Sequence, residues 1–207
     1  MLSTKERILA AATDLLDTGG PSAITLRAVG DAAGISQSAP YRHFADKRAL
    51  LDALVRQIIH QMRGAVEAAR SEATSPAAAL NSVVAQYFDY ARRYPVRYRL
   101  LLEESRRDCA VGAEARQTFD TLADLVHRAQ TSGELQAGDP HQIVALVFGA
   151  LHGIADLEQF GLIKIAPDAD SAEPLPALLV SLLSRRPRSP EVSALRPAPA
   201  PPGLGVI

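Results

Sequence analysis

The sequence predicts an all-α protein, with three short helices near the N-terminus and a larger helical bundle after them. Apolar residues recur at three- and four-residue spacing along most of the chain, and Ala, Leu and Arg are abundant. The alternation of apolar and polar residues that is typical of strands is nearly absent. With 207 residues, of which 47% are hydrophobic and 22% charged, the chain is long enough to bury a substantial core.

The first two helices have clear start and stop signals. Ser3 and Glu6 form a capping-box pattern, in which each side chain satisfies a free N–H group at the start of a helix. The Gly-Gly-Pro step at residues 19–21 is predicted to end this helix. Thr25 is predicted to cap a short second helix, which Gly34 closes.

A third short helix is predicted from Ser36, its N-cap, to about His43, and Asp46 is predicted to cap the fourth. Residues 34–36, between the second and third helices, have the length and glycine content of the turn in a helix-turn-helix motif. In that motif the helix after the turn enters the major groove of DNA. Pro40 falls in the first turn of this helix, where its missing N–H group should cost little.

These elements predict a helix-turn-helix DNA-binding domain over residues 1–47, joined by the fourth helix to a second helical domain over residues 48–186. Caps and prolines mark the later helices. One helix is expected to begin at Ser75-Pro76 and to be interrupted at Tyr94-Pro95, after which a second runs from Val96 to Ser105. Three more are expected: Ala113 to Gln130, Gln142 to Phe160, and a last one from Pro174 or Pro176 through Leu183. Residues 187–207 are rich in Pro and Ala without periodicity, which predicts a disordered tail.

Charge and composition limit the partners. The formal net charge is -1, so no global basic field indicates nucleic acid, and any such binding must be local. The single cysteine, Cys109, excludes an intramolecular disulfide and agrees with a reducing compartment. There is no signal-peptide pattern and no apolar run of about 18 residues. We therefore expect a cytoplasmic protein that has no membrane partner.

Roughly the first 55 residues resemble the N-terminal domain of the TetR family of bacterial transcriptional repressors, over the run RILAAATDLLDTGGPSAITLRAVGDAAGISQSAPYRHFADKRALLDAL. The first helix, the threonine-led second helix, the turn, the APYRHF segment and the Asp-Lys step into the fourth helix follow in order at fitting spacings. Gly30 stands where the family usually has alanine, which should weaken the second helix by up to about 1 kcal/mol. Ser38 replaces a common glycine and adds a hydroxyl that could reach DNA.

The residue types after the turn suit a helix in the major groove, because small residues let the backbone approach while polar and aromatic residues reach outward. We expect Gln37 to read a base edge, and Ser38 and Ala39 to add hydroxyl and thymine-methyl contacts. Lys47, at the positive end of the fourth helix, is expected to clamp a phosphate. The predicted DNA-binding residues are Thr25, Arg27, Ser36, Gln37, Ser38, Ala39, Tyr41, Arg42, His43 and Lys47.

Two roles stay open for several of these residues. Thr25 caps the second helix and could also bind a phosphate, and Arg27 could contact a phosphate or a guanine edge. Tyr41 either contacts phosphate or packs its ring on the domain core. His43 either contacts phosphate or orients against a neighbouring helix. Phe44 is expected in the core, as are the apolar positions of the second helix.

For the rest of the chain, the resemblance implies a domain that dimerises and holds a small-molecule pocket. Leu151-His152-Gly153 is similar to a Trp-His-Gly step in one branch of the family, with leucine in place of tryptophan. The predicted effector-pocket residues are Tyr87, Tyr90, Tyr98, Leu101, Phe119, Leu122, Phe148 and His152. Few charges fall among them, which predicts a largely apolar effector with one or two polar anchors. The alternative is that these side chains are ordinary core residues and that His152 is a core histidine.

The expected helix over residues 142–160 is apolar on more than one face, so it should be buried against its own domain and a second subunit. With the last helix it would form a four-helix interface about a two-fold axis. The predicted interface residues are Val144, Leu151, Leu178 and Leu182. Two recognition helices about 34–36 Å apart, or further for a longer operator, would then face an inverted repeat in double-stranded DNA.

Catalysis and metal binding are the contrasting hypotheses. Histidines and carboxylates are present, but the chain has no HExxH, CxxC, Gly-rich phosphate loop or GxSxG motif. We therefore expect no enzymatic activity, no metal and no cofactor. Two questions stay open: whether a regulator of this kind acts without a ligand or as an activator, and whether Cys109, close to two arginines, is inert or senses oxidants.

Overall fold

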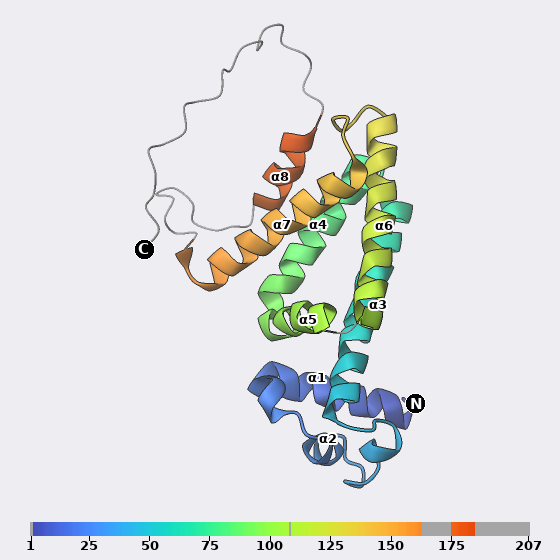
Figure 1. Ribbon diagram of the computed structural model, residues 1–207, viewed down its shortest axis with the longest axis vertical. Coiled ribbons are helices and arrows are strands. Elements are labelled where there is room, and N and C mark those ends of the chain that lie inside the picture. The colour runs from blue at the N-terminus through green and yellow to red at the C-terminus, as the bar shows by residue number, and fades with distance from the viewer. Residues whose placement is uncertain (1, 108, 163–174, 185–207) are drawn as a thin grey trace, which may run out of the picture.

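The computed structural model describes residues 2–107, 109–162 and 175–184, and these residues form an all-α fold (Figure 1). The N-terminal part contains α1 (Thr4–Ala23), α2 (Leu26–Ala32), the short 3₁₀-helix η1 (Pro40–Arg42) and the first half of α3 (Lys47–Glu72). The larger part adds α4 (Pro76–Arg93), α5 (Pro95–Arg107), α6 (Cys109–Thr131), α7 (Pro140–Gln159) and α8 (Leu175–Leu183). The predicted fold class is confirmed. The predicted disorder of residues 187–207 concerns a segment outside the described residues.

Most helices begin at the caps that the sequence predicts. The N–H group of Glu6 donates to the Ser3 hydroxyl at 3.2 Å, and the N–H group of Ser3 donates to the Glu6 carboxylate at 2.7 Å. At four further helices the side chain of the N-cap residue accepts a backbone N–H group: Thr25 for α2, Asp46 for α3, Ser75 for α4 and Asp139 for α7. Gly20, at φ 69°, interrupts the helical path of α1 just before Pro21, at the predicted stop.

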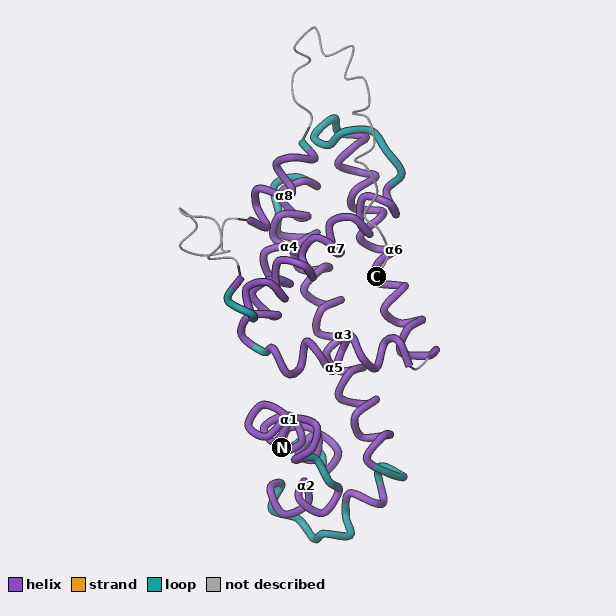
Figure 2. The backbone as a smooth tube through the Cα atoms, turned by 60° about the vertical axis from the view of Figure 1, so that its left-hand side comes forward, coloured by secondary structure: helices purple, strands orange, loops and turns teal. Residues whose placement is uncertain are grey.

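The buried side chains form two clusters, and α3 runs through both (Figure 2). The first cluster packs α1 and α2 on the N-terminal half of α3, around residues such as Leu16 and Leu50. The second packs the C-terminal half of α3 with α4, α6, α7 and α8. Leu100 and Leu101 of α5 belong to the first cluster, so α5 also connects the two. The boundary at residues 47–48 stays a prediction.

Residues 36–43, the recognition segment, do not form the predicted α-helix. They form a turn followed by η1, in which the N–H of Ala39 donates to Ser36 O at 2.9 Å and that of Arg42 donates to Ala39 O at 3.1 Å. Pro40 is the physical reason, because it has no N–H group to donate to Ser36 O across an α-helical turn. The Ser36 hydroxyl lies 3.3 Å from the Ser38 hydroxyl and does not cap a helix.

The later helix boundaries lie close to the predicted ones. α4 ends at Arg93 and α5 begins at Pro95, because the proline cannot continue the hydrogen-bond ladder of α4. α8 is tied to the loop after α6, where the N–H of Gln136 donates to Leu183 O at 2.9 Å. Among the described helices, none has the length and apolar character that crossing a membrane requires.

Candidate DNA-binding surface and ligand cavity

The recognition segment presents its polar side chains to solvent. Pro40 and Phe44 are buried and fix the segment on α2 and α3, while Tyr41 is 59% exposed. The exposure of Tyr41 excludes the alternative in which its ring packs on the domain core. Of the predicted DNA contacts, the exposed ones are Thr25, Arg27, Ser36, Gln37, Ser38, Tyr41, Arg42 and His43. Ala39 and Lys47 are half-buried.

Gly30 lets α2 lie directly against the recognition segment. A methyl group at this position would stand 3.2 Å from Gln37 Cα and 3.3 Å from both Ser36 O and Pro40 Cγ. These contacts are tighter than ordinary van der Waals packing, so alanine would fit only if the segment moved outward. The sequence identified Gly30 only as a weak helix former, and its contacts give the glycine a packing role.

The side chain of Gln37 is held by a residue that the sequence did not single out. Its Nε2 donates to Asp31 Oδ1 at 3.0 Å, and both residues are exposed. A glutamine reads a base edge with its amide oxygen and one N–H group, so the bond to Asp31 restricts how the Gln37 amide can turn towards a base. Asp31 therefore places a negative charge beside the residue predicted to read sequence, where it would repel phosphate.

Two basic side chains fasten the surface to α1. Arg7 Nη2 donates to Ala33 O at 2.7 Å and to Gly34 O at 3.3 Å, which fixes the turn after α2. Lys47 Nζ donates to Pro21 O at 2.6 Å. Arg7 was missed by sequence reasoning because its acceptors are backbone carbonyls 26 and 27 positions along the chain, which no local pattern reveals.

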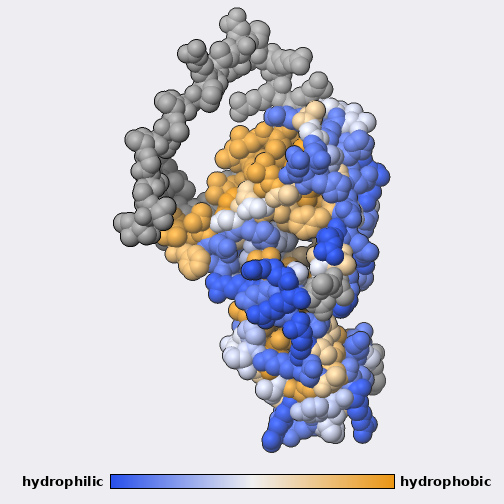
Figure 3. Space-filling view, viewed as in Figure 1, coloured by the Kyte–Doolittle hydropathy of each residue, from blue (hydrophilic) through white to orange (hydrophobic). Residues whose placement is uncertain are grey.

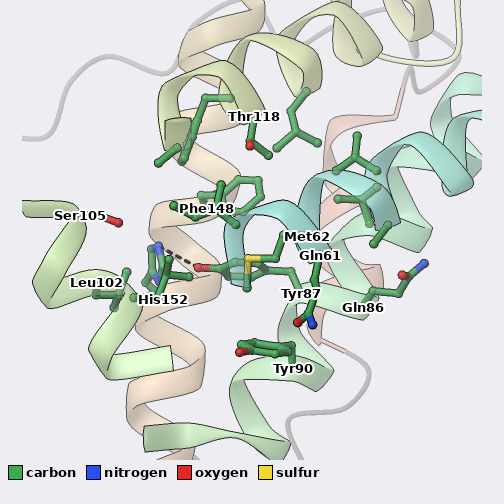
Figure 4. A pocket seen from close by; sticks show the side chains of 18 residues that line it. Gln61, Met62, Gln86, Tyr87, Tyr90, Leu102, Ser105, Thr118, Phe148 and His152 are labelled. Atoms are coloured by element: carbon green, nitrogen blue, oxygen red, sulfur yellow. Dashed lines mark hydrogen bonds between the residues drawn. The ribbon is translucent and has the colours of Figure 1, made fainter. Parts of the chain in front are cut away.

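A cavity of about 350 Å³ lies in the larger part, between α3, α4, α5, α6 and α7 (Figure 4). Every predicted effector-pocket residue except Tyr98 lines it: Tyr87, Tyr90, Leu101, Phe119, Leu122, Phe148 and His152. The wall also contains α3 residues such as Ile59 and Met62, and polar groups such as Thr118. The sequence did not indicate the contribution of α3, because a periodic apolar face does not show which part of it faces a void.

His152 joins two tyrosines at the cavity wall. Its Nδ1 hydrogen-bonds the Tyr98 hydroxyl, and its Nε2 lies 3.5 Å from the Tyr87 hydroxyl. Tyr98 is fully buried and stands behind the imidazole rather than in the wall. Burial lowers the pKa of His152, with the nearby Asp156 carboxylate opposing, and burial raises the pKa of both tyrosines. Burial therefore favours the neutral form of all three groups.

Tyr90 connects the cavity wall to the N-terminal part. Its ring lines the cavity and lies 5.3 Å, centroid to centroid, from the ring of Tyr94, which in turn lies 4.3 Å from the Arg97 guanidinium. Arg97 Nε donates to Asp17 Oδ1 of α1 at 2.7 Å. Burial raises the pKa of Tyr90 to about 12, while the neighbouring Arg97 acts in the opposite direction. These contacts form a continuous packed path from the cavity to α1.

The structure corrects two of the four predicted dimer residues. Val144 and Leu151 are 2% and 1% exposed within one protomer, so they have no surface left to bury against a second subunit. They face inward because α7 turns this side towards α4 and α6. Leu178 and Leu182 are about half exposed, as expected of interface residues. The apolar surface over α7 and α8 (Figure 3) is formed by Leu146, Leu157, Phe160, Leu178 and Leu182.

Together these features define a class of protein. A helix-turn-helix surface at one end, connected through α3 and α5 to a helical body with a small-molecule-sized cavity, defines a DNA-binding transcriptional regulator rather than an enzyme. In the described part of the chain, no three His, Cys, Asp or Glu side chains gather as a metal site would require.

Comparison with known families assigns the chain within this class. Residues 8–54 match the family described as bacterial regulatory proteins, tetR family, and residues 80–182 match the tetracyclin repressor-like C-terminal domain. The chain belongs to the TetR family of DNA-binding transcriptional regulators.

Individual proteins are similar to this chain in sequence or in fold. The HTH-type transcriptional regulator RutR of Escherichia coli K12 is 26% identical over 157 residues, which cover 73% of this chain and 74% of RutR. A protein of unknown function from Rhodococcus sp. RHA1 superposes with a TM-score of 0.76 at 26% identity, over 89% of this chain and 97% of that one. SmeT, the repressor of the Stenotrophomonas maltophilia multidrug efflux pump SmeDEF, shares the fold at a TM-score of 0.63 and 24% identity, over 95% and 98% of the two chains.

Proposed function

We propose that this regulator is a repressor, which binds an inverted-repeat operator as a homodimer and is released by a small, largely apolar effector. One observation carries the proposal: α3 begins just after the exposed recognition segment and lines the cavity with its middle part, while α5 lines the cavity and packs against α1. A ligand that changes the cavity wall therefore acts on elements that also support the DNA-binding surface. Such coupling between two sites is typically worth about 1–3 kcal/mol.

At the DNA, the amide of Gln37, which Asp31 holds in the free protein, contacts a base edge, while Ser38 and Ala39 supply smaller groove contacts. The other predicted residues position the protein on the backbone: Thr25, Arg27, Ser36, Tyr41, Arg42, His43 and Lys47. Lys47 reaches a phosphate by leaving Pro21 O, to which it donates in the free protein. Sequence preference thus depends on a few side chains, and affinity on many.

The exposed apolar face of α7 and α8 supports the homodimer. Leu146 and Phe160 are 61% and 70% exposed, and an apolar face of this kind on a monomer is a typical protein interface. Pairing this face with the same face of a second copy forms a two-fold four-helix interface. The two recognition segments then face the same side of the DNA, which explains the expected inverted repeat.

Release is proposed to pass through the Tyr90 path. An effector that presses on the ring of Tyr90 moves Tyr94 and Arg97, and through Asp17 it moves α1 against the operator. Leu101 gives a second route, since it both lines the cavity and belongs to the first buried cluster. An effector can change the affinity for DNA only if it binds the DNA-bound and the released conformation of the protein with different affinities.

The test starts from operators selected from random DNA by the purified protein. We expect an inverted repeat, two protomers bound per site in sedimentation, and transcription from a promoter carrying the site that falls when the protein is added. A single unrepeated half-site bound by one protomer would contradict the dimeric operator. Transcription that rises instead would replace repression by activation.

A further inference from the structure

The described part of the cavity wall offers no counter-charge to an ionic ligand. Among the described residues that line it, none is Asp, Glu, Lys or Arg, and most are apolar or aromatic. His152 is the lining side chain that could become positive, and burial lowers its pKa. A carboxylate or ammonium group that enters this cavity loses its hydration and gains no oppositely charged partner, which strongly disfavours binding. An uncharged ligand does not incur this loss.

The hydrogen bonds around His152 show where a polar group of the ligand belongs. A neutral imidazole has one N–H donor and one acceptor nitrogen, so one of its two tyrosine partners donates to the ring and the other accepts from it. Tyr98 is fully buried, and within the described part of the chain the hydroxyl of this residue has one hydrogen-bond partner, His152 Nδ1. If Tyr98 were the acceptor, its own proton would be a buried donor without a partner, which is costly.

Tyr98 therefore donates to Nδ1, and the Nε2–H group of His152 points at the Tyr87 hydroxyl, 3.5 Å away. The O–H proton of Tyr87 then has no protein acceptor in the ring system. Tyr87 lies in the cavity wall, and Figure 4 shows its hydroxyl group pointing to His152. Other polar side chains line the cavity, and those of Gln86 and Thr118 donate to Ser82 and to Glu114 O within their own helices. Tyr87 thus presents to the aromatic side of the cavity a hydrogen-bond donor that the ring system leaves without an acceptor.

We infer that the cavity binds an uncharged, mostly apolar small molecule with one acceptor oxygen, a carbonyl, ether or hydroxyl, which accepts the proton of Tyr87. This inference rests on the proposed function, in which the cavity is the effector site. The cavity volume of about 350 Å³ falls in the range of small-molecule sites. The rings of Phe119 and Phe148, with centroids 5.1 Å apart, suit an aromatic skeleton.

The test uses four probes with one skeleton and one point of difference: acetylnaphthalene, isopropylnaphthalene, naphthoate and naphthylmethylammonium. Binding to the full-length protein is measured by calorimetry at pH 7. We expect the ketone to bind about five- to tenfold more tightly than the isopropyl compound, which has the same shape but no acceptor. Both ions should bind at least about 100-fold more weakly than the ketone.

Tyr87→Phe isolates the proposed hydrogen bond. It should reduce the affinity for the ketone to that for the isopropyl compound and leave the latter unchanged. Ser71→Ala, which removes an exposed hydroxyl from α3 outside the cavity, should change neither. A second measurement does not depend on affinity: the infrared carbonyl stretch of the bound ketone should lie at lower frequency in the parent protein than in the Tyr87→Phe variant.

The outcomes separate this inference from the proposed function. Tightest binding by naphthoate or by the ammonium probe, equal binding by the ketone and the isopropyl compound, or no binding by any probe would overturn the inference. Operator release is measured separately with the tightest-binding probe. If the ketone binds as expected but leaves the affinity for the operator unchanged, the ligand chemistry stands and the effector role of the cavity fails.

Discussion

The N-terminal and C-terminal parts of the molecule hold their functional side chains in different ways. The recognition segment is short, and side-chain hydrogen bonds hold Gln37 within it and fasten the residues on either side of it to α1, through Arg7 and Lys47. The cavity is surrounded by long helices whose packed side chains leave a space that no side chain fills. Polar substitutions should therefore change DNA binding locally, whereas apolar ones in the larger part should affect folding first.

The largest effect is expected on the inward face of α7. Leu151→Ala removes a fully buried side chain and should lower the free energy of unfolding by about 2–5 kcal/mol, as measured by urea denaturation at fixed protomer concentration. Leu146→Ala, on the outward face of the same helix, is the matched control. It should change the unfolding of the monomer by less than about 0.5 kcal/mol and weaken self-association in sedimentation. If Leu151→Ala instead weakened self-association without changing the unfolding free energy, Leu151 would belong to the dimer interface after all.

At the recognition segment, Gln37→Ala should reduce the free energy of discrimination between bases by about 1–3 kcal/mol at one position of the operator, and change it little at the other positions. The measurement is a set of binding isotherms on operators that differ at single positions. Gln117→Ala, an exposed glutamine on α6, serves as the control. A loss that is the same on every DNA sequence would assign Gln37 to the phosphate backbone instead.

Lys47→Ala should lower the affinity for all DNA sequences by about the same factor. If Lys47 neutralises one phosphate, its loss should reduce the slope of log affinity against log salt concentration by about one unit. Lys5→Ala, an exposed lysine at the start of α1, controls for net charge. A drop in affinity with an unchanged slope would instead mean that Lys47 contributes only by holding Pro21 O.

The smallest effect is expected in the contact between the two parts. Asp17→Asn keeps the shape of the side chain but removes the charge that pairs with Arg97, and a partly exposed pair contributes at most about 1 kcal/mol to stability. The main effect of Asp17→Asn should be on the coupling between the cavity and the DNA-binding surface: the effector should weaken operator binding less in this variant than in the parent. Asp89→Asn, which breaks the exposed pair with Arg93 within α4, should leave the coupling unchanged. Equal coupling in all three proteins would exclude this path.

Local signals predicted the elements of the fold, and distant contacts limited the prediction of the sites. Caps such as Asp46 and stops such as Gly20 are encoded in neighbouring residues, so the helix boundaries were close to those observed. Pro40 misled the prediction, because a proline that fits the first turn of an α-helix also fits a 3₁₀-turn. Periodicity alone did not show which face of α7 is covered by its own domain.

Several residues of the predicted effector pocket line a cavity where helices converge, and their role in binding an effector stays a prediction. Tyr87, Phe148 and His152 line the cavity, but Tyr98 lies behind the imidazole, a distinction that needs coordinates. The pairing of Asp17 with Arg97 joins residues 80 positions apart, and nothing in the sequence near either residue indicates the other. Regulation through such contacts is therefore the part of the function that sequence reveals least.

The continuity of α3 turns a small rotation into a large displacement. Met62 in the cavity wall lies fifteen residues along this helix from Lys47 at the DNA end, a distance of about 22 Å at 1.5 Å per residue. A tilt of only about 8° about the cavity end then moves Lys47 by about 3 Å, the length of a hydrogen bond. The ligand need not unfold or reorder anything, because the helix itself multiplies the motion as a lever arm does.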